Sequence, residues 1–203
     1  MMRSIEGRVM ATVAPWLLSL GLALTSAFAT GKAPSGLVYS TSSANVVQRQ
    51  SAPGSCHSIG RALYSRPDPH CTPGVVNPAV TQATIGTTIC RSGWTSTVRP
   101  PESITRSEKR ASMAAYGLRG SASRYEYDHN VPLELGGAVN DPRNLWPEPD
   151  YPLRSSFYLN PKDRLENVLK GMVCRGAMTL AQAQRLIASN WVTAYNQLHI
   201  GGA

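Results

Sequence analysis

The chain has 203 residues and carries 20 Lys and Arg against 12 Asp and Glu, which gives a formal net charge of +8. This length fits one domain with tails, and a hydrophobic content of 42% excludes a wholly disordered chain. Only 16% of the residues are charged, and 17 Gly and 15 Pro interrupt regular structure, so a coiled coil or a long helical rod is excluded. The basic excess favours an anionic partner such as nucleic acid, lipid head groups or wall polymers.

Residues 1–29 have the pattern of a secretory signal peptide. Two arginines precede an uncharged, Leu- and Ala-rich stretch over residues 9–30, and Ala27 and Ala29 supply the small residues that a signal peptidase reads. An uncleaved anchor is the alternative, because the stretch is long enough to span a bilayer. Cleavage after Ala29 is favoured, which predicts a secreted or cell-envelope protein that does not remain in the membrane.

The mature chain keeps four cysteines. In an exported protein this even number predicts two disulfides among Cys56, Cys71, Cys90 and Cys174, with the three pairings left open. The neighbouring Cys56-His57 and His70-Cys71 pairs also allow a zinc site. The usual Cys-x-x-Cys spacing is missing, so disulfides are favoured.

The N-terminal part of the mature chain is predicted to be rich in loops. Residues 30–54 are rich in Ser, Ala, Thr and Gly and are predicted to form a flexible leader to a single domain over residues 55–203. Residues 80–86 fit either a short helix or a strand. A helix is predicted from Thr105 to Tyr116, because Thr105 and Glu108 have capping-box spacing.

Two short strands and two helices are predicted to follow. The alternation from Arg124 to Asp128 indicates a strand, and residues 144–146 indicate a second one before the break at two prolines. A helix is predicted from about Pro161, and another after Thr179, which has capping-box spacing to Gln182. Apolar residues at helical spacing give both helices a face suited to a core: Leu165, Val168, Leu169 and Met172, then Leu180, Ala183, Ile187, Trp191 and Ala194.

The acidic residues are concentrated in one window. Eight of the eleven acidic residues of the mature chain lie in residues 126–166, beside only four basic residues, so the window carries a net charge of −4 and the rest +11. This distribution suits a hard cation bound beside a polyanion, and equally an acidic solvated loop.

Asp128 and His129 form the chemically most suggestive pair in that window. At the end of a strand, a carboxylate can bind a metal ion while the adjacent neutral imidazole takes a proton from water, as attack on phosphorus requires. The metal ion can stabilise charge on the phosphoryl and leaving oxygens.

The surrounding residues resemble a known family. Tyr127-Asp128-His129, the loop 133–137 (Leu-Glu-Leu-Gly-Gly) and Asn144-Leu145 resemble the HNH motif of ββα-metal nucleases over roughly residues 124–170. Further stretches are similar to those of small exported bacterial proteins with such a motif: residues 71–74, 98–101 and 144–149. The resemblance implies an α+β fold with a small ββα-metal core, additional flanking helices and a loop-rich, disulfide-stapled N-terminal part.

The resemblance also implies roles for three residues. Asp128 matches a metal ligand, His129 matches the general base that activates water, and Asn144 matches the residue that ties the loop together and helps orient the base. An Asx-turn is the alternative for Asn144. One divalent metal ion is implied; Mg²⁺ is the default for an oxygen-rich site, with Mn²⁺ or Ca²⁺ as alternatives.

The chain departs from the family at the third metal-binding position. No His occurs between His129 and His199. The predicted helix offers Asp163, Glu166 and Asn167 on one face instead. Glu166 is favoured as the third ligand, followed by Asp163, and ordinary helix-surface polarity is the alternative for each.

Four more residues near the motif have candidate roles. Arg143, Lys162 and Arg164 flank the predicted site and are candidates for phosphate contacts, with a solvated surface as the alternative. Trp146 is suited to stacking on a base, but packing in the core is favoured.

Three functions compete. The leading prediction is an exported, metal-dependent HNH endonuclease that hydrolyses phosphodiester bonds of nucleic acid, with DNA favoured over RNA. The alternative is a non-catalytic exported binding protein on a degenerate HNH scaffold, which the missing His favours. A disulfide-stapled structural protein, in which Asp128 and His129 are merely a buried pair, is the third.

Overall fold

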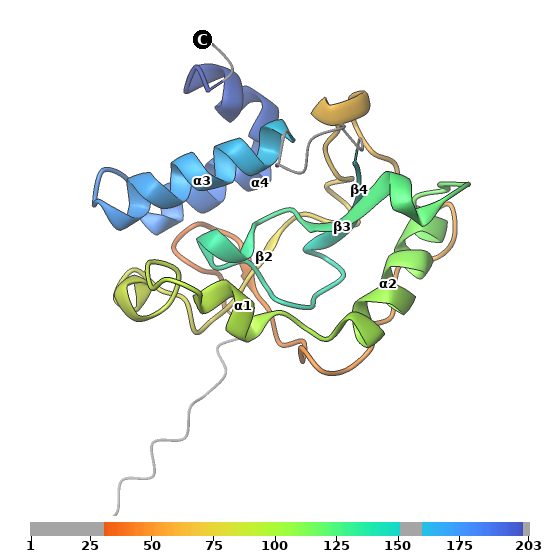
Figure 1. Cartoon of the computed structure of the whole chain (residues 1–203), viewed down its shortest axis with the longest axis horizontal. Helices are drawn as coiled ribbons and strands as arrows, with labels where there is room; N and C mark the ends of the chain where they lie inside the picture. Colours follow the sequence, from red (N-terminus) through yellow and green to blue (C-terminus); the bar gives the residue numbers. More distant parts are fainter. Residues whose placement is uncertain (1–30, 151–159, 201–203) are drawn as a thin grey trace, which may run out of the picture.

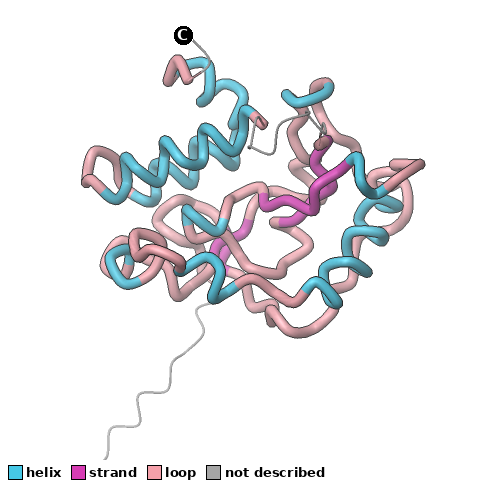
Figure 2. Tube along the Cα trace, viewed as in Figure 1, coloured by secondary structure: helices cyan, strands magenta, loops and turns pink. Residues whose placement is uncertain are grey.

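The computed structural model describes residues 31–150 and 160–200. The predicted signal peptide lies outside the described residues. The described part has a mixed α+β fold with four α-helices, two small two-stranded sheets and long connecting loops, as Figures 1 and 2 show. This confirms the predicted fold at the level of class. No helix in this part of the chain is long and apolar enough to cross a membrane.

The segment predicted to be a flexible leader is tied to the domain instead. Its strand β1 (Val38–Tyr39) pairs in parallel with β2 (Val75–Val76). The hydroxyls of Ser40 and Ser42 donate to one carboxylate oxygen of Asp141 at 2.8 and 3.2 Å. Small hydroxyl residues, which suggested flexibility, therefore serve as hydrogen-bond donors to a buried carboxylate.

Two disulfides brace the loops, as the cysteine count predicted. Cys56 is bonded to Cys71 and Cys90 to Cys174. The second bond joins the loop before α1 (Trp94–Val98) to the end of α3 (Pro161–Cys174), across a sequence separation of 84 residues. Residues 80–84 form irregular structure and turns, and residues 85–86 begin a short 3-10 helix (Ile85–Thr87), so the short-helix alternative holds only at the end of this stretch.

Helix α2 (Glu102–Ala115) begins three residues before the predicted start. The capping-box interpretation failed because Glu108 turns into the interior. Its carboxylate accepts hydrogen bonds from the backbone N–H of Gln48 at 2.6 Å and from the Asn140 amide at 3.1 Å. The Glu108 side chain therefore binds groups that are distant in the sequence, and it does not cap the start of the helix.

Strands β3 (Tyr125–His129) and β4 (Leu145–Pro149) form an antiparallel pair. Asp128 lies opposite Trp146, and His129 lies opposite Leu145. The strand β4 runs through Pro147 and beyond, which a two-stranded sheet tolerates because each strand has a free edge. Trp146 is completely buried, so it belongs to the core, as favoured.

The chain closes with α3 and α4 (Leu180–Gln197), which lie side by side in Figure 1, while α2 packs on β4. The side chain of Asn160 caps α3, and Thr179 and Gln182 form the predicted capping box of α4. Val168 is exposed, contrary to the predicted stripe. The buried face of the pair consists mainly of Leu165, Leu169, Val173, Ala183, Ile187, Trp191 and Ala194.

Candidate functional site

The turn between β3 and β4 is organised by the side chain of Asn144. Its amide oxygen accepts from the N–H groups of Val131 at 2.9 Å and Val75 at 3.3 Å. Its amide nitrogen donates to the carbonyls of Val131 and Ala138, both at 3.0 Å. A Cβ atom on Gly137 would overlap the Val131 carbonyl, so this close approach requires glycine. Asn144 thus fixes the loop that follows His129.

Burial favours the neutral form of His129, and the loop fixes the tautomer of its ring. Its Nε2 lies 3.0 Å from the carbonyl oxygen of Val139. Because a carbonyl only accepts, Nε2 carries the proton and Nδ1 keeps a free lone pair. Burial lowers the pKa of His129 to about 4, although the charge of Asp128 acts in the opposite direction. At neutral pH the ring is therefore an acceptor of protons.

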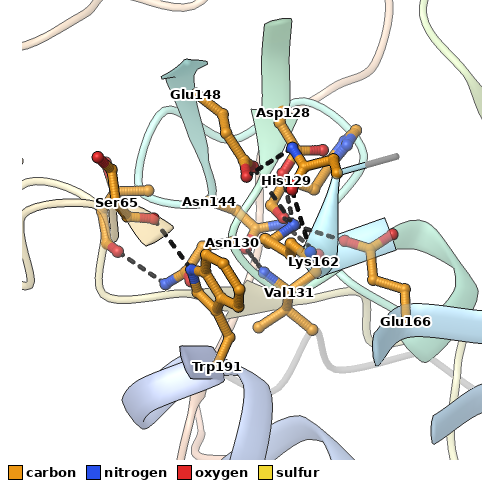
Figure 3. A network of polar contacts seen from close by, with 12 residues as sticks. Ser65, Asp128, His129, Asn130, Val131, Asn144, Glu148, Lys162, Glu166 and Trp191 are labelled. Atoms are coloured by element: carbon orange, nitrogen blue, oxygen red, sulfur yellow. Dashed lines mark hydrogen bonds and ion pairs between the residues drawn. The ribbon is translucent and has the colours of Figure 1, made fainter. Parts of the chain in front are cut away.

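The carboxylate of Asp128 is bound by a buried lysine. The Nζ of Lys162 lies 2.5 Å from Asp128 Oδ2, 2.5 Å from Glu166 Oε1 and 2.8 Å from the backbone oxygen of His129. A third carboxylate, that of Glu148, lies 3.8 Å away. Figure 3 shows these side chains gathered around Lys162. The ammonium group thus links the end of β3 to α3.

Glu148 was missed by sequence reasoning. It lies in β4 between two prolines, which were interpreted as the end of the strand. It is buried and accepts a hydrogen bond from the Asn160 amide at 2.9 Å. Burial, together with the charge of Asp128, raises its pKa well above the ordinary value. The raised pKa favours a proton on Glu148, and this proton reduces the repulsion among the carboxyl groups of Asp128, Glu148 and Glu166.

A cavity of about 320 Å³ brings most of the predicted site residues together. It is lined by both residues of the Asp128-His129 pair and by all three candidate ligands from the helix: Asp128, His129, Asp163, Glu166 and Asn167. Sequence reasoning missed four further polar residues on its wall: Thr95, Arg99, Glu126 and Glu134. Thr95 lies in α1, Arg99 in the loop before α2, Glu126 in β3 and Glu134 in the turn after β3, and none of them had a signal beyond polarity.

Acidic side chains outnumber basic ones on the cavity wall. Burial raises the pKa of Asp163 to about 6 and that of Glu166 to about 8, and the nearby charge of Asp128 adds to both effects. Lys162 opposes these shifts without cancelling them. Raised pKa values mean that these carboxyl groups hold protons readily, and a cation bound beside them would favour their ionised form.

The basic residues predicted to contact phosphates lie in three different surroundings. Lys162 has no exposed side-chain area, so it is part of the interior instead of a phosphate-binding surface. Arg143 pairs with Asp141 at 2.7 Å and does not line the cavity. Arg164 is exposed on α3, outside the cavity wall.

The oxygen donors of the cavity can be compared with what a magnesium ion requires. Among the described residues, no three His, Cys, Asp or Glu side chains are grouped so that they could hold a metal ion. Mg²⁺ is commonly bound by one or two carboxylates together with water and substrate phosphates. The oxygen atoms of Asp128, Asp163 and Asn167 on the cavity wall match that chemistry. Glu166, the favoured third ligand, is engaged by Lys162 instead.

Comparison of the chain with protein-family models, with curated proteins and with solved structures finds no match.

Proposed function

We propose that this protein is an exported endonuclease of the HNH type, which hydrolyses phosphodiester bonds of nucleic acid with the help of a divalent metal ion. One observation carries the proposal: a neutral His129 lies beside Asp128 on a cavity wall that also includes three oxygen donors of α3. These groups come from distant parts of the chain, and they supply the base and the acidic surroundings that such a reaction requires.

His129 acts as the general base. Its Nδ1 takes a proton from a water molecule, and the carbonyl of Val139 keeps the ring in the required tautomer. The negative charge of Asp128 raises the pKa of the ring, so it stabilises the imidazolium that forms. Asn144 keeps the Val139 segment in place by binding Val131 and Ala138 on either side of the turn.

The remaining groups of the cavity bind and orient. Asp128 and Asp163 would hold the metal ion together with a phosphate oxygen of the substrate, and the ion would stabilise negative charge on the phosphoryl group. Arg99, which lines the same cavity, binds a neighbouring phosphate. The +11 charge of the mature chain outside residues 126–166 favours a polyanion, and we propose DNA over RNA.

A second candidate function is binding of nucleic acid or wall polymer without cleavage. Lys162 favours it, because its ammonium group pairs with Asp128 and Glu166, two of the carboxylates that a catalytic metal ion would need. In that case the acidic cluster stabilises the fold, and the basic remainder of the surface binds the polyanion.

A cleavage assay separates the two candidates. The oxidised protein from residue 30 onward is incubated with supercoiled plasmid and with RNA, in Mg²⁺, Mn²⁺, Ca²⁺ or EDTA. His129→Ala is compared with His57→Ala, which removes an exposed imidazole outside the cavity. Metal-dependent nicking that His129→Ala loses and His57→Ala keeps supports the nuclease. Salt-sensitive binding without cleavage under any metal supports the binding protein instead.

A further inference from the structure

Lys162 brings a positive charge to the place where three carboxylates meet in the interior. Its ammonium group makes three contacts of 2.5 to 2.8 Å, with Asp128, Glu166 and the His129 carbonyl. The carboxylate of Glu148 completes the surroundings at 3.8 Å. None of the Lys162 side chain is exposed. A lysine and a glutamate four residues apart usually form a surface pair, so this burial needs an explanation.

The cluster has the composition of a cation site. Carboxylate and carbonyl oxygens are the groups that bind hard divalent cations, and here they surround an ammonium group instead. Each N–H of the ammonium group is used by one of the three short contacts. Without it, the buried acidic groups of Asp128, Glu148 and Glu166 would face one another without a counter-charge, and ionised carboxylates among them would be costly.

We propose that Lys162 is a built-in cation that occupies the position a metal ion would take among Asp128, Glu148 and Glu166. It holds the Asp128 carboxylate and the His129 backbone in place, so the cavity is preformed without a resident metal ion. Only one carboxylate oxygen of Asp128 stays free of Lys162. On the proposed nuclease function, the metal ion is therefore held weakly and binds together with substrate.

The test is to remove the built-in cation and supply an external one. Lys162→Met keeps an unbranched side chain that is one atom shorter, and it loses the charge. In EDTA, its melting temperature should fall by about 10 °C, since the cluster then lacks a counter-charge. Ca²⁺ should restore most of this loss, and calorimetry should find Ca²⁺ binding about tenfold tighter than in the native protein.

Lys170→Met is the matched control. Lys170 is on the same helix and pairs with Glu134 at 3.2 Å, but it is partly exposed and outside the cluster. Its loss should leave the response to Ca²⁺ as in the native protein. The double variant Lys162→Met/Glu166→Gln removes one carboxylate, and the rescue by Ca²⁺ should weaken in it.

Two results would overturn the proposal. One is an equal response to Ca²⁺ in Lys162→Met and in the native protein. The other is a Lys162→Met protein that remains unfolded with every cation tested. The experiment measures thermal stability and Ca²⁺ binding, and neither depends on cleavage of nucleic acid. If the protein proves not to be a nuclease, the expected results for Lys162→Met stay the same.

Discussion

Removal of the Asn144 side chain should destabilise the protein far more than an ordinary polar substitution. Asn144 is fully buried, and its amide satisfies polar backbone groups of Val75, Val131 and Ala138. In Asn144→Ala, two N–H groups and two carbonyls lose this partner in a place that is closed to solvent. The substitution therefore destabilises the protein mainly through these unpaired backbone groups, in addition to the loss of the side chain itself.

The magnitude follows from the number of groups left unpaired. An unsatisfied buried donor or acceptor costs about 1 to 3 kcal/mol, so four such groups cost about 4 kcal/mol even at the low end. For a chain of this size, each kcal/mol lowers the melting temperature by about 2 to 4 °C, which gives a fall of about 12 °C. Asn167→Ala, at an exposed position of α3, should change stability by less than about 0.5 kcal/mol.

The assay is urea unfolding of the oxidised proteins, followed by tryptophan fluorescence and by far-ultraviolet circular dichroism. Coincident transitions from the two probes justify the free energies of unfolding. A decrease in the free energy of unfolding below about 1 kcal/mol for Asn144→Ala would refute the reasoning, because a single unpaired buried group should already cost that much.

Three further predictions concern the turn, the disulfides and the base. Gly137→Ala should lower stability by about 2 kcal/mol in thermal melts, because its Cβ would overlap the Val131 carbonyl, whereas Gly86→Ala, with open space around it, should be neutral. Replacing the Cys90–Cys174 bond by two serines should lower the free energy of unfolding by about 4.6 kcal/mol, and replacing Cys56–Cys71 should lower it by about 3 kcal/mol, because the closed loops span 84 and 15 residues. Urea unfolding measures both losses. A larger loss for Cys56–Cys71 than for Cys90–Cys174 would contradict this account. Because burial lowers the pKa of His129 from 6.5 to about 4, its acid limb of the rate profile should lie near pH 4, and a limb that stays near pH 6.5 in saturating Mg²⁺, which keeps Asp163 ionised, would contradict it. The unfolded chain binds this proton first, so the His129 contribution also lowers stability as pH falls from 6.5 to about 4, and His129→Ala should lack that part of the pH dependence.

Helices with local signals were predictable from the sequence. The capping box of Thr179 and Gln182 is present in α4, and the stripe from Leu180 to Ala194 is part of the core, as predicted. The start of α2 was missed, because Glu108 pairs with the distant Gln48 and not with the helix end. Local spacing thus predicts an element well where its polar groups find partners nearby, and fails where tertiary contacts compete.

Part of the cavity lining was predictable from the sequence, and its arrangement was not. Asp128, His129 and the acidic face of α3 were named from the motif and the helical spacing, and the structure places them on one wall. The position of Lys162 was not predictable, since its spacing to Glu166 is that of a solvent-exposed pair. Lys162 is buried among Asp128, Glu166 and Glu148, and the prolines of β4 concealed the last of these.

The most direct test of the central claim is single-turnover cleavage of a labelled DNA duplex in Mg²⁺ by the native protein and by His129→Ala. The account predicts a rate about 10² to 10⁴ times lower in His129→Ala, with duplex binding unchanged, because the variant lacks the base that activates water. Cleavage by His129→Ala at the native rate, or a native protein that binds the duplex and never cuts it, would contradict the claim.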